Sequence, residues 1–82
     1  MYYIYILRSK LDQKHYTGYT SDLKKRLKEH QMGNVESTKN RRPLELIYYE
    51  AYQLKRLALM REKFLKTTKG KLQLRKQFEK RA

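Results

Sequence analysis

The stretch MYYIYILRSKLDQKHYTGYT, residues 1–20, predicts the core of the fold. Residues 2–7 are almost wholly aromatic or aliphatic, which is typical of a β-strand. A polar turn at residues 12–14 separates this strand from a second short strand expected over residues 15–19. Because the two strands are adjacent and joined by a short turn, they are expected to pair as a hairpin.

A helical pattern follows the hairpin. Thr20, Ser21 and Asp22 offer side-chain oxygens that can accept the free amides of a first helical turn. A helix is therefore expected over residues 22–32, with Gly33 as its terminator. Residues 34–43 are polar and basic and show no periodicity, which predicts a mobile loop.

The second half of the chain predicts one more strand and two more helices. The strand is expected over residues 44–49 and the first of these helices from residue 53 to 67 or 68. Gly70 is expected to break the helical pattern before a final basic helix over residues 72–80. The order ββαβαα indicates an α/β protein of the α+β kind, with a small three-stranded sheet flanked by helices. Residues 1–82 are expected to form a single domain.

The charge of the chain points to a polyanionic partner. Lys and Arg number 21 against 8 Asp and Glu, which gives a formal net charge of +13. Nucleic acid is the leading candidate, and an anionic membrane surface or an acidic protein is the alternative. The chain has no cysteine, which excludes disulfides, thiol catalysis and zinc sites built on Cys ligands. With no secretory leader and no apolar run long enough to span a bilayer, a cytoplasmic location and no membrane partner are expected.

Helical periodicity separates one Arg and one His from the neighbouring lysines of the first helix. Leu23 and Leu27 define its apolar line, and Arg26 and His30 fall beside that line, toward the sheet. The alternative is structural: an Arg whose stem covers apolar surface, and a His satisfied at the core boundary.

Glu62 occupies a similar position at the edge of the apolar stripe of the second helix. An isolated carboxylate among cations can hold a divalent metal ion. It can equally form an i,i+4 ion pair with Lys66, worth a few tenths of a kcal/mol. In the hairpin, Tyr16 precedes Gly18, where a glycine allows close approach of a ligand or of another backbone.

These residues together resemble the GIY-YIG nuclease superfamily, in particular its short single-domain bacterial members, often described as uncharacterised or URI-domain proteins. The two motif triplets appear as residues 3–5, Tyr-Ile-Tyr, and residues 16–18, Tyr-Thr-Gly. The helix that follows carries the motif Arg26 and then His30. Arg61 and Glu62 are similar to the metal-binding segment of the family, and the resemblance covers nearly the whole chain.

The resemblance implies a role for each matched position. Tyr5 and Tyr16 would be the two active-site tyrosines, and Arg26 would bind and polarise the scissile phosphate. Glu62 would be the single protein ligand of a hydrated Mg²⁺ or Mn²⁺, and His30 would assist proton transfer or orient a tyrosine. The expected activity is metal-dependent hydrolysis of nucleic-acid phosphodiesters, with DNA favoured over RNA.

Two other functions compete with the nuclease. Many relatives place an Asn after the metal helix, but no Asn follows Asn40, so a nucleic-acid-binding module with weak or no catalysis is the main alternative. A protein-interaction or membrane-surface module built on the basic C-terminal helix is the weaker one. Nucleic acid is expected to contact a set of basic residues: Lys39, Arg41, Arg42, Lys66 and Lys69. A domain this small covers little nucleic acid, which leaves room for a homodimer or a partner protein.

Overall fold

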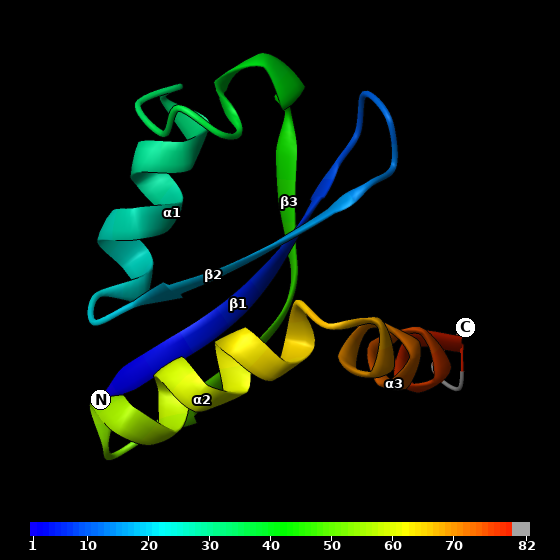
Figure 1. The fold of residues 1–82 in the computed structure, drawn as a ribbon. Coiled ribbons are helices and arrows are strands. Elements are labelled where there is room, and N and C mark those ends of the chain that lie inside the picture. Colours follow the sequence, from blue (N-terminus) through cyan, green and yellow to red (C-terminus); the bar gives the residue numbers. More distant parts are fainter. Residues whose placement is uncertain (80–82) are drawn as a thin grey trace.

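The computed structural model describes residues 1–79 and confirms the predicted order of elements. Its strands and helices, with one short 3₁₀ helix added before the last strand, are β1 (Tyr2–Ser9), β2 (His15–Thr20), α1 (Leu23–Gln31), η1 (Lys39–Arg41), β3 (Leu44–Tyr52), α2 (Lys55–Leu65) and α3 (Thr68–Glu79). The strands form one antiparallel sheet in the order β2-β1-β3, with β1 at its centre (Figure 1). The chain is therefore a small α/β protein, as predicted.

The central strand β1 sends alternate side chains to opposite faces of the sheet, as strand geometry requires. Ile4 and Ile6 face one core, whereas Tyr5 and Leu7 face the other. All four are at most 1% exposed. The strand predicted over residues 2–7 is therefore confirmed, and both of its faces are buried.

Each face of the sheet has its own helices (Figure 1). One core joins β1 to α2 and α3 through five buried side chains: Ile4, Ile6, Ala58, Leu65 and Leu74. The other joins the opposite face to α1 through buried or partly buried side chains: Tyr5, Leu7, Tyr16, Leu23, Leu27, Leu44 and Leu46. Residues that approach β2 from α1 and from α2 therefore come from opposite sides of the sheet.

Gly70 does not break the final helix, so this part of the sequence prediction is wrong. The helix α3 begins at Thr68, and the Thr67 hydroxyl accepts the Gly70 amide at 3.1 Å as a helix N-cap does. Gly70 is buried against the end of α2, where a Cβ atom would overlap the Phe64 carbonyl oxygen and lie 2.7 Å from Leu65 Cα. Its missing side chain therefore lets two helices meet backbone to backbone.

Other boundaries shift by a few residues. The strand β3 continues to Tyr52, beyond the predicted end at residue 49, and α2 starts at Lys55 and ends at Leu65, inside its predicted bounds. The predicted end of the last helix, residue 80, lies outside the described residues. Within the described part of the chain, no helix has the length and apolar character needed to cross a membrane.

The segment at residues 34–43 is packed against the domain, so the prediction of a mobile loop is wrong. Val35 and Thr38 are buried, and η1 forms inside the segment. The Thr38 carbonyl accepts the Arg41 amide at 2.9 Å, and the Ser9 hydroxyl donates to the Arg41 carbonyl at 2.6 Å. The backbone polar groups of the segment therefore find partners within it and on β1.

Candidate active site

The hydroxyl group of Tyr5 is the centre of the candidate site. Tyr5 is fully buried beneath α1, and its hydroxyl lies 2.7 Å from His30 Nε2. The Arg26 Nε donates to the same oxygen at 3.4 Å, which is a long and weak hydrogen bond. Two of the residues predicted on α1 therefore meet the first predicted tyrosine at one atom.

Local sequence explains why α1 presents Arg26 and His30 together. Asp22 caps the helix by accepting the Lys25 amide at 3.1 Å, which fixes where α1 begins. Leu23 and Leu27 then pack on the sheet. Because Arg26 and His30 are four residues apart, they lie one above the other on the flank of that apolar line. The predicted orientation of both residues is confirmed.

His30 has a hydrogen-bond partner at each ring nitrogen. Its Nε2 faces Tyr5, and its Nδ1 lies 2.8 Å from the hydroxyl oxygen of Thr38. The ring is 1% exposed, and this burial, aided by the positive charge of Arg26 and opposed by Glu29, lowers its pKa to about 4. His30 is therefore neutral at neutral pH, with one ring nitrogen able to accept a proton.

Tyr16 stands beside this pair and is only partly buried. Its ring centroid lies 5.3 Å from that of His30 and 6.4 Å from that of Tyr5, so the three rings form one aromatic cluster. Ring pairs in tilted or edge-on geometry at such distances attract one another. The second predicted tyrosine thus reaches the same site from β2 and lies nearer the surface than Tyr5.

Gly18 provides the space that the Tyr5 side chain occupies. It is the register partner of Tyr5 on β2, and a Cβ atom at Gly18 would overlap the Tyr5 hydroxyl and ring. The close approach predicted at this glycine is therefore made by the phenol of Tyr5.

The environment of Tyr5 favours its neutral form. Burial raises the pKa of Tyr5, and the neighbouring Tyr16 and Glu62 add to that effect. The hydrogen bond and charge of Arg26 lower the pKa but do not overcome burial. Tyr5 is accordingly protonated at neutral pH in the free protein.

Glu62 comes from α2, on the other side of the sheet, yet its charge acts on Tyr5. Its side chain is 21% exposed and forms an ion pair with Lys66 at 3.4 Å, the alternative partner suggested by the i,i+4 spacing. A partly exposed pair of this kind is worth about 1 kcal/mol or less, so a divalent cation can displace Lys66 from Glu62.

The position of α2 is fixed by Arg61, the residue before Glu62. The Arg61 guanidinium donates to both carboxylate oxygens of Glu50 on β3, at 3.0 and 3.2 Å. Tyr48 and Tyr52 also donate to Glu50. This cluster attaches α2 to the far edge strand and so limits how Glu62 can move. The sequence analysis did not identify Glu50; its signal would have been a lone acid among tyrosines.

The donor set around Glu62 fits a hydrated Mg²⁺ or Mn²⁺ better than a metal held wholly by protein. Among the described residues, no group of three or more His, Asp and Glu side chains lies close enough together to enclose a metal ion. Magnesium usually keeps several water ligands and binds through one or two carboxylates together with substrate phosphates. The partly exposed carboxylate of Glu62, which follows Arg61 in α2, meets that requirement.

Most of the predicted nucleic-acid-binding cations have partners within the protein. Lys39 pairs with Glu36 at 3.2 Å and Arg41 with Asp12 at 3.6 Å. Arg42 donates to the carbonyl groups of Lys39 and Gln31 and covers Gly33, and Lys66 pairs with Glu62. Lys69 is exposed on α3. Exposed pairs are weak, so these cations can still contact phosphate, but several are already oriented by the fold.

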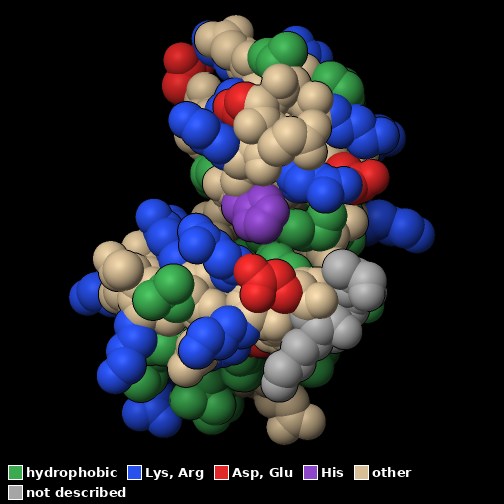
Figure 2. All heavy atoms as spheres, turned by 90° about the vertical axis from the view of Figure 1, so that its right-hand side faces the viewer, with side chains coloured by type: hydrophobic (Ala, Val, Ile, Leu, Met, Phe, Trp, Pro, Cys, Tyr) green, Lys and Arg blue, Asp and Glu red, His purple; other side chains and the backbone are tan. Residues whose placement is uncertain are grey.

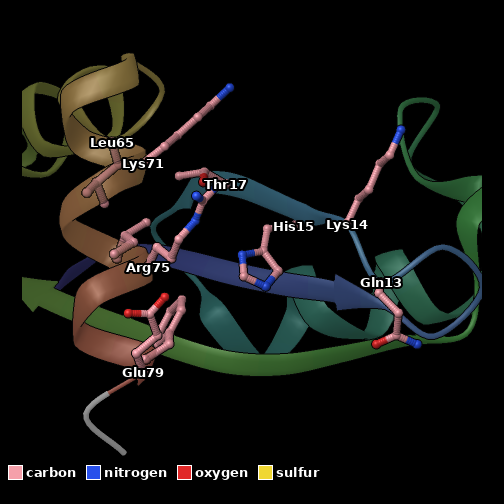
Figure 3. Close-up of a pocket in the computed structure, with 10 residues that line it drawn as sticks. Gln13, Lys14, His15, Thr17, Leu65, Lys71, Arg75 and Glu79 are labelled. Atoms are coloured by element: carbon pink, nitrogen blue, oxygen red, sulfur yellow. The ribbon is translucent and has the colours of Figure 1, made fainter.

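A cleft of about 600 Å³ lies between β2 and α3, on the opposite side of β2 from Tyr16. Figure 3 shows Arg75 reaching from α3 toward Thr17, Lys71 extending outward at one end of the cleft, and Lys14 farther along β2. The His15 ring lies edge-on to Phe78, with centroids 5.6 Å apart. Figure 2 shows this side of the molecule, where Lys and Arg side chains are spread more widely than Asp and Glu side chains.

Comparison with known proteins shows extended similarity. Residues 1–77 match the model of the GIY-YIG catalytic domain. A UPF0213 protein of Clostridium perfringens is 44% identical over 77 residues, spanning 90% of this chain and 82% of the relative. A UPF0213 protein of Staphylococcus saprophyticus is 45% identical over 67 residues, spanning 80% of each chain. The solution NMR structure of a UPF0213 protein from Bacillus halodurans is similar with a TM-score of 0.56 and 37% identity, covering 90% of this chain and 82% of that one.

Proposed function

Because the chain belongs to the GIY-YIG family and is related to the UPF0213 proteins, we propose that it is a metal-dependent endonuclease that hydrolyses DNA phosphodiesters. The observation that carries this proposal is the arrangement around the Tyr5 hydroxyl. His30 and Arg26 bond to it, Tyr16 packs beside it, and the charge of Glu62 acts on it. Phosphodiester hydrolysis needs charge stabilisation, proton transfer and a metal ligand, and this cluster offers a candidate for each.

Arg26 is the candidate phosphate ligand. Its side chain is 36% exposed, so the guanidinium can reach a substrate while its Nε holds Tyr5. In the free protein its Nη1 pairs with Glu29 at 3.3 Å, a pair weak enough for a phosphate to replace. A guanidinium presents its donors in a planar fork that fits two phosphate oxygens.

The two tyrosines take different parts in this proposal. Tyr5 is fully buried and therefore acts beneath the substrate, where it links Arg26 to His30. Tyr16 is nearer the surface and is the hydroxyl that would meet the attacking water. A neutral phenol is a weak base, so the approach of Arg26 and of a bound cation would assist proton transfer to or from Tyr16.

Glu62 would hold the Mg²⁺ or Mn²⁺ ion, with water and phosphate oxygens as the other ligands. When bound, the ion would stabilise negative charge on the leaving oxygen. In the free protein this carboxylate is paired with Lys66.

The basic cleft supplies a path for the strand that flanks the scissile phosphate. Thr17 of the cleft wall is the neighbour of Tyr16, and side chains of adjacent strand residues point to opposite faces. A nucleic-acid strand that binds Arg26 and crosses the edge of β2 would next contact Lys71 and Arg75. Such contacts give affinity without sequence preference.

The test is a cleavage assay on a panel of duplex, nicked, branched and single-stranded DNA and RNA, with Mg²⁺ or Mn²⁺. Wild type is compared with Glu62→Gln and with Glu36→Gln, a matched control on an exposed acid that also pairs with a lysine. The proposal expects cleavage by wild type and Glu36→Gln, and its loss in Glu62→Gln. Equal cleavage by all three proteins would exclude Glu62 as the metal ligand.

A nucleic-acid-binding module is the second candidate, and the Glu62–Lys66 pair favours it. The carboxylate needed for the metal already has a partner in the protein, and it belongs to no group of three or more candidate metal ligands among the described residues. This candidate predicts salt-sensitive binding that Glu62→Gln leaves unchanged, together with no cleavage of any substrate in the panel.

A further inference from the structure

We propose that Thr38 is a positioning residue that sets the tautomer of His30 and so makes His30 Nε2 the acceptor for the Tyr5 hydroxyl proton. The catalytic consequence rests on the proposed nuclease function, whereas the tautomer itself does not. Thr38 lies in the segment between α1 and β3 and belongs to neither motif triplet nor either motif helix.

The first step of the argument is geometric. Three polar groups form a continuous chain from the Tyr5 hydroxyl, 2.7 Å to His30 Nε2, and from His30 Nδ1, 2.8 Å to Thr38 Oγ1. Tyr5 and Thr38 are 0% exposed and His30 is 1% exposed. A buried ring bonded at both nitrogens has one orientation, because turning it would leave buried polar atoms without partners.

The second step counts hydrogens. Arg26 Nε donates to the Tyr5 oxygen, so that oxygen already serves as an acceptor. Within residues 1–79, the hydrogen-bond partners of the Tyr5 hydroxyl are Arg26, which has no acceptor, and His30 Nε2. A hydrogen on Nε2 would bring a third hydrogen to the Tyr5 oxygen, which carries its own and accepts one from Arg26, so we assign the Tyr5 hydrogen to the bond with an unprotonated Nε2. A neutral imidazole carries one N–H, so the hydrogen lies on Nδ1 and is donated to Thr38.

The third step gives the tautomer a use. With Nε2 as the acceptor of its hydrogen bond, the Tyr5 hydroxyl keeps its proton and directs its oxygen toward Arg26, the candidate phosphate ligand. The ring stays neutral, and its one hydrogen, on Nδ1, stays bonded to Thr38. An aliphatic side chain at residue 38 would leave the Nδ1 hydrogen buried without an acceptor, which disfavours this tautomer.

The chain offers a direct spectroscopic test, because it contains only two histidines. With ¹⁵N-labelled imidazole groups, NMR assigns a protonated Nδ1 and an unprotonated Nε2 to His30, and His15 serves as the internal reference. Thr38→Val, which keeps the shape and removes the hydroxyl, is expected to shift His30 mainly to the Nε2–H form. Thr38→Ser, which keeps the hydroxyl, is expected to retain the wild-type signals.

Two results would overturn the proposal: a wild-type His30 protonated at Nε2, or an unchanged tautomer in Thr38→Val. If Thr38→Val does not fold, the wild-type and Thr38→Ser spectra still decide the question. In the cleavage assay, Thr38→Val is expected to lower kcat about fivefold to tenfold with little change in KM, and Thr38→Ser to restore it. If wild type binds but does not cleave, the nuclease function fails while the spectra still test the tautomer.

Discussion

Replacement of Gly18 by Ala tests the central contact of the site. A Cβ atom at Gly18 would overlap the Tyr5 hydroxyl and ring. Tyr5 cannot simply move aside, because it is fully buried and its hydroxyl is held by His30 at 2.7 Å. We therefore expect Gly18→Ala to displace the phenol, weaken the bond to His30 and lower both stability and activity.

The size of the effect follows from opposing contributions. An extra methyl group in a packed core costs about 1–3 kcal/mol, and the weakened hydrogen bond about 0.5–1.5 kcal/mol more. Replacing glycine by alanine inside a strand restores about 0.5–1 kcal/mol of backbone entropy. The net destabilisation should thus be about 0.5–4 kcal/mol. For a domain of this size each kcal/mol lowers Tm by about 4–8 °C.

The assay is urea denaturation of four proteins: wild type, Gly18→Ala, Tyr5→Phe and the double variant. Because Tyr5→Phe removes one of the overlapped atoms, the hydroxyl oxygen, together with the bond to His30, Gly18→Ala should cost about 1 kcal/mol less in that background, although the ring overlap remains. Additive effects would show that the methyl group does not displace the Tyr5 hydroxyl. A Gly18→Ala variant as stable as wild type would show that the Tyr5 ring does not occupy the space beside Gly18.

Three further predictions concern charge. His30, whose pKa is lowered to about 4, should stay neutral in an NMR titration down to pH 5. An unfolded histidine titrates near 6.5. The contribution of His30 to the free energy of unfolding, roughly 3 kcal/mol, should therefore be present above pH 6.5 and disappear as the pH falls to about 4. Glu50→Gln should cost about 1–3 kcal/mol in urea denaturation by weakening the bonds from Arg61. Lys71→Gln should reduce the slope of log affinity against log salt by about 1 in a binding titration, whereas Lys24→Gln on the outer face of α1 should not.

The fold follows from the sequence because its signals are periodic. The aromatic and aliphatic run of β1 predicts a strand, and the apolar line through Leu23 and Leu27 predicts a buried helix face; both are confirmed. Gly70 shows where such reasoning fails. A glycine that ends a helix and one that lets two helices touch look alike in sequence, and only the position of Phe64 distinguishes them.

The candidate site was predictable only where it lies on regular elements. Arg26 and His30 could be placed because helical periodicity points them toward the sheet. Thr38 could not be placed, since residues 34–43 bury only Val35 and Thr38 and show no period. The cleft between β2 and α3 was also not predicted, because its walls come together only through the way α3 packs against the sheet.

The position of the site follows from β2 being an edge strand. Tyr5 belongs to the core shared with α1, whereas Glu62 lies on α2, which packs on the other face. In the middle of a sheet, groups on opposite faces are separated by the strands and by the side chains of those strands. At this edge, the register partner of Tyr5 is Gly18, which has no side chain. The phenol therefore extends over β2, where the charge of Glu62 acts on it. A domain with two small cores can thus combine residues from both faces in one site while each core stays closed.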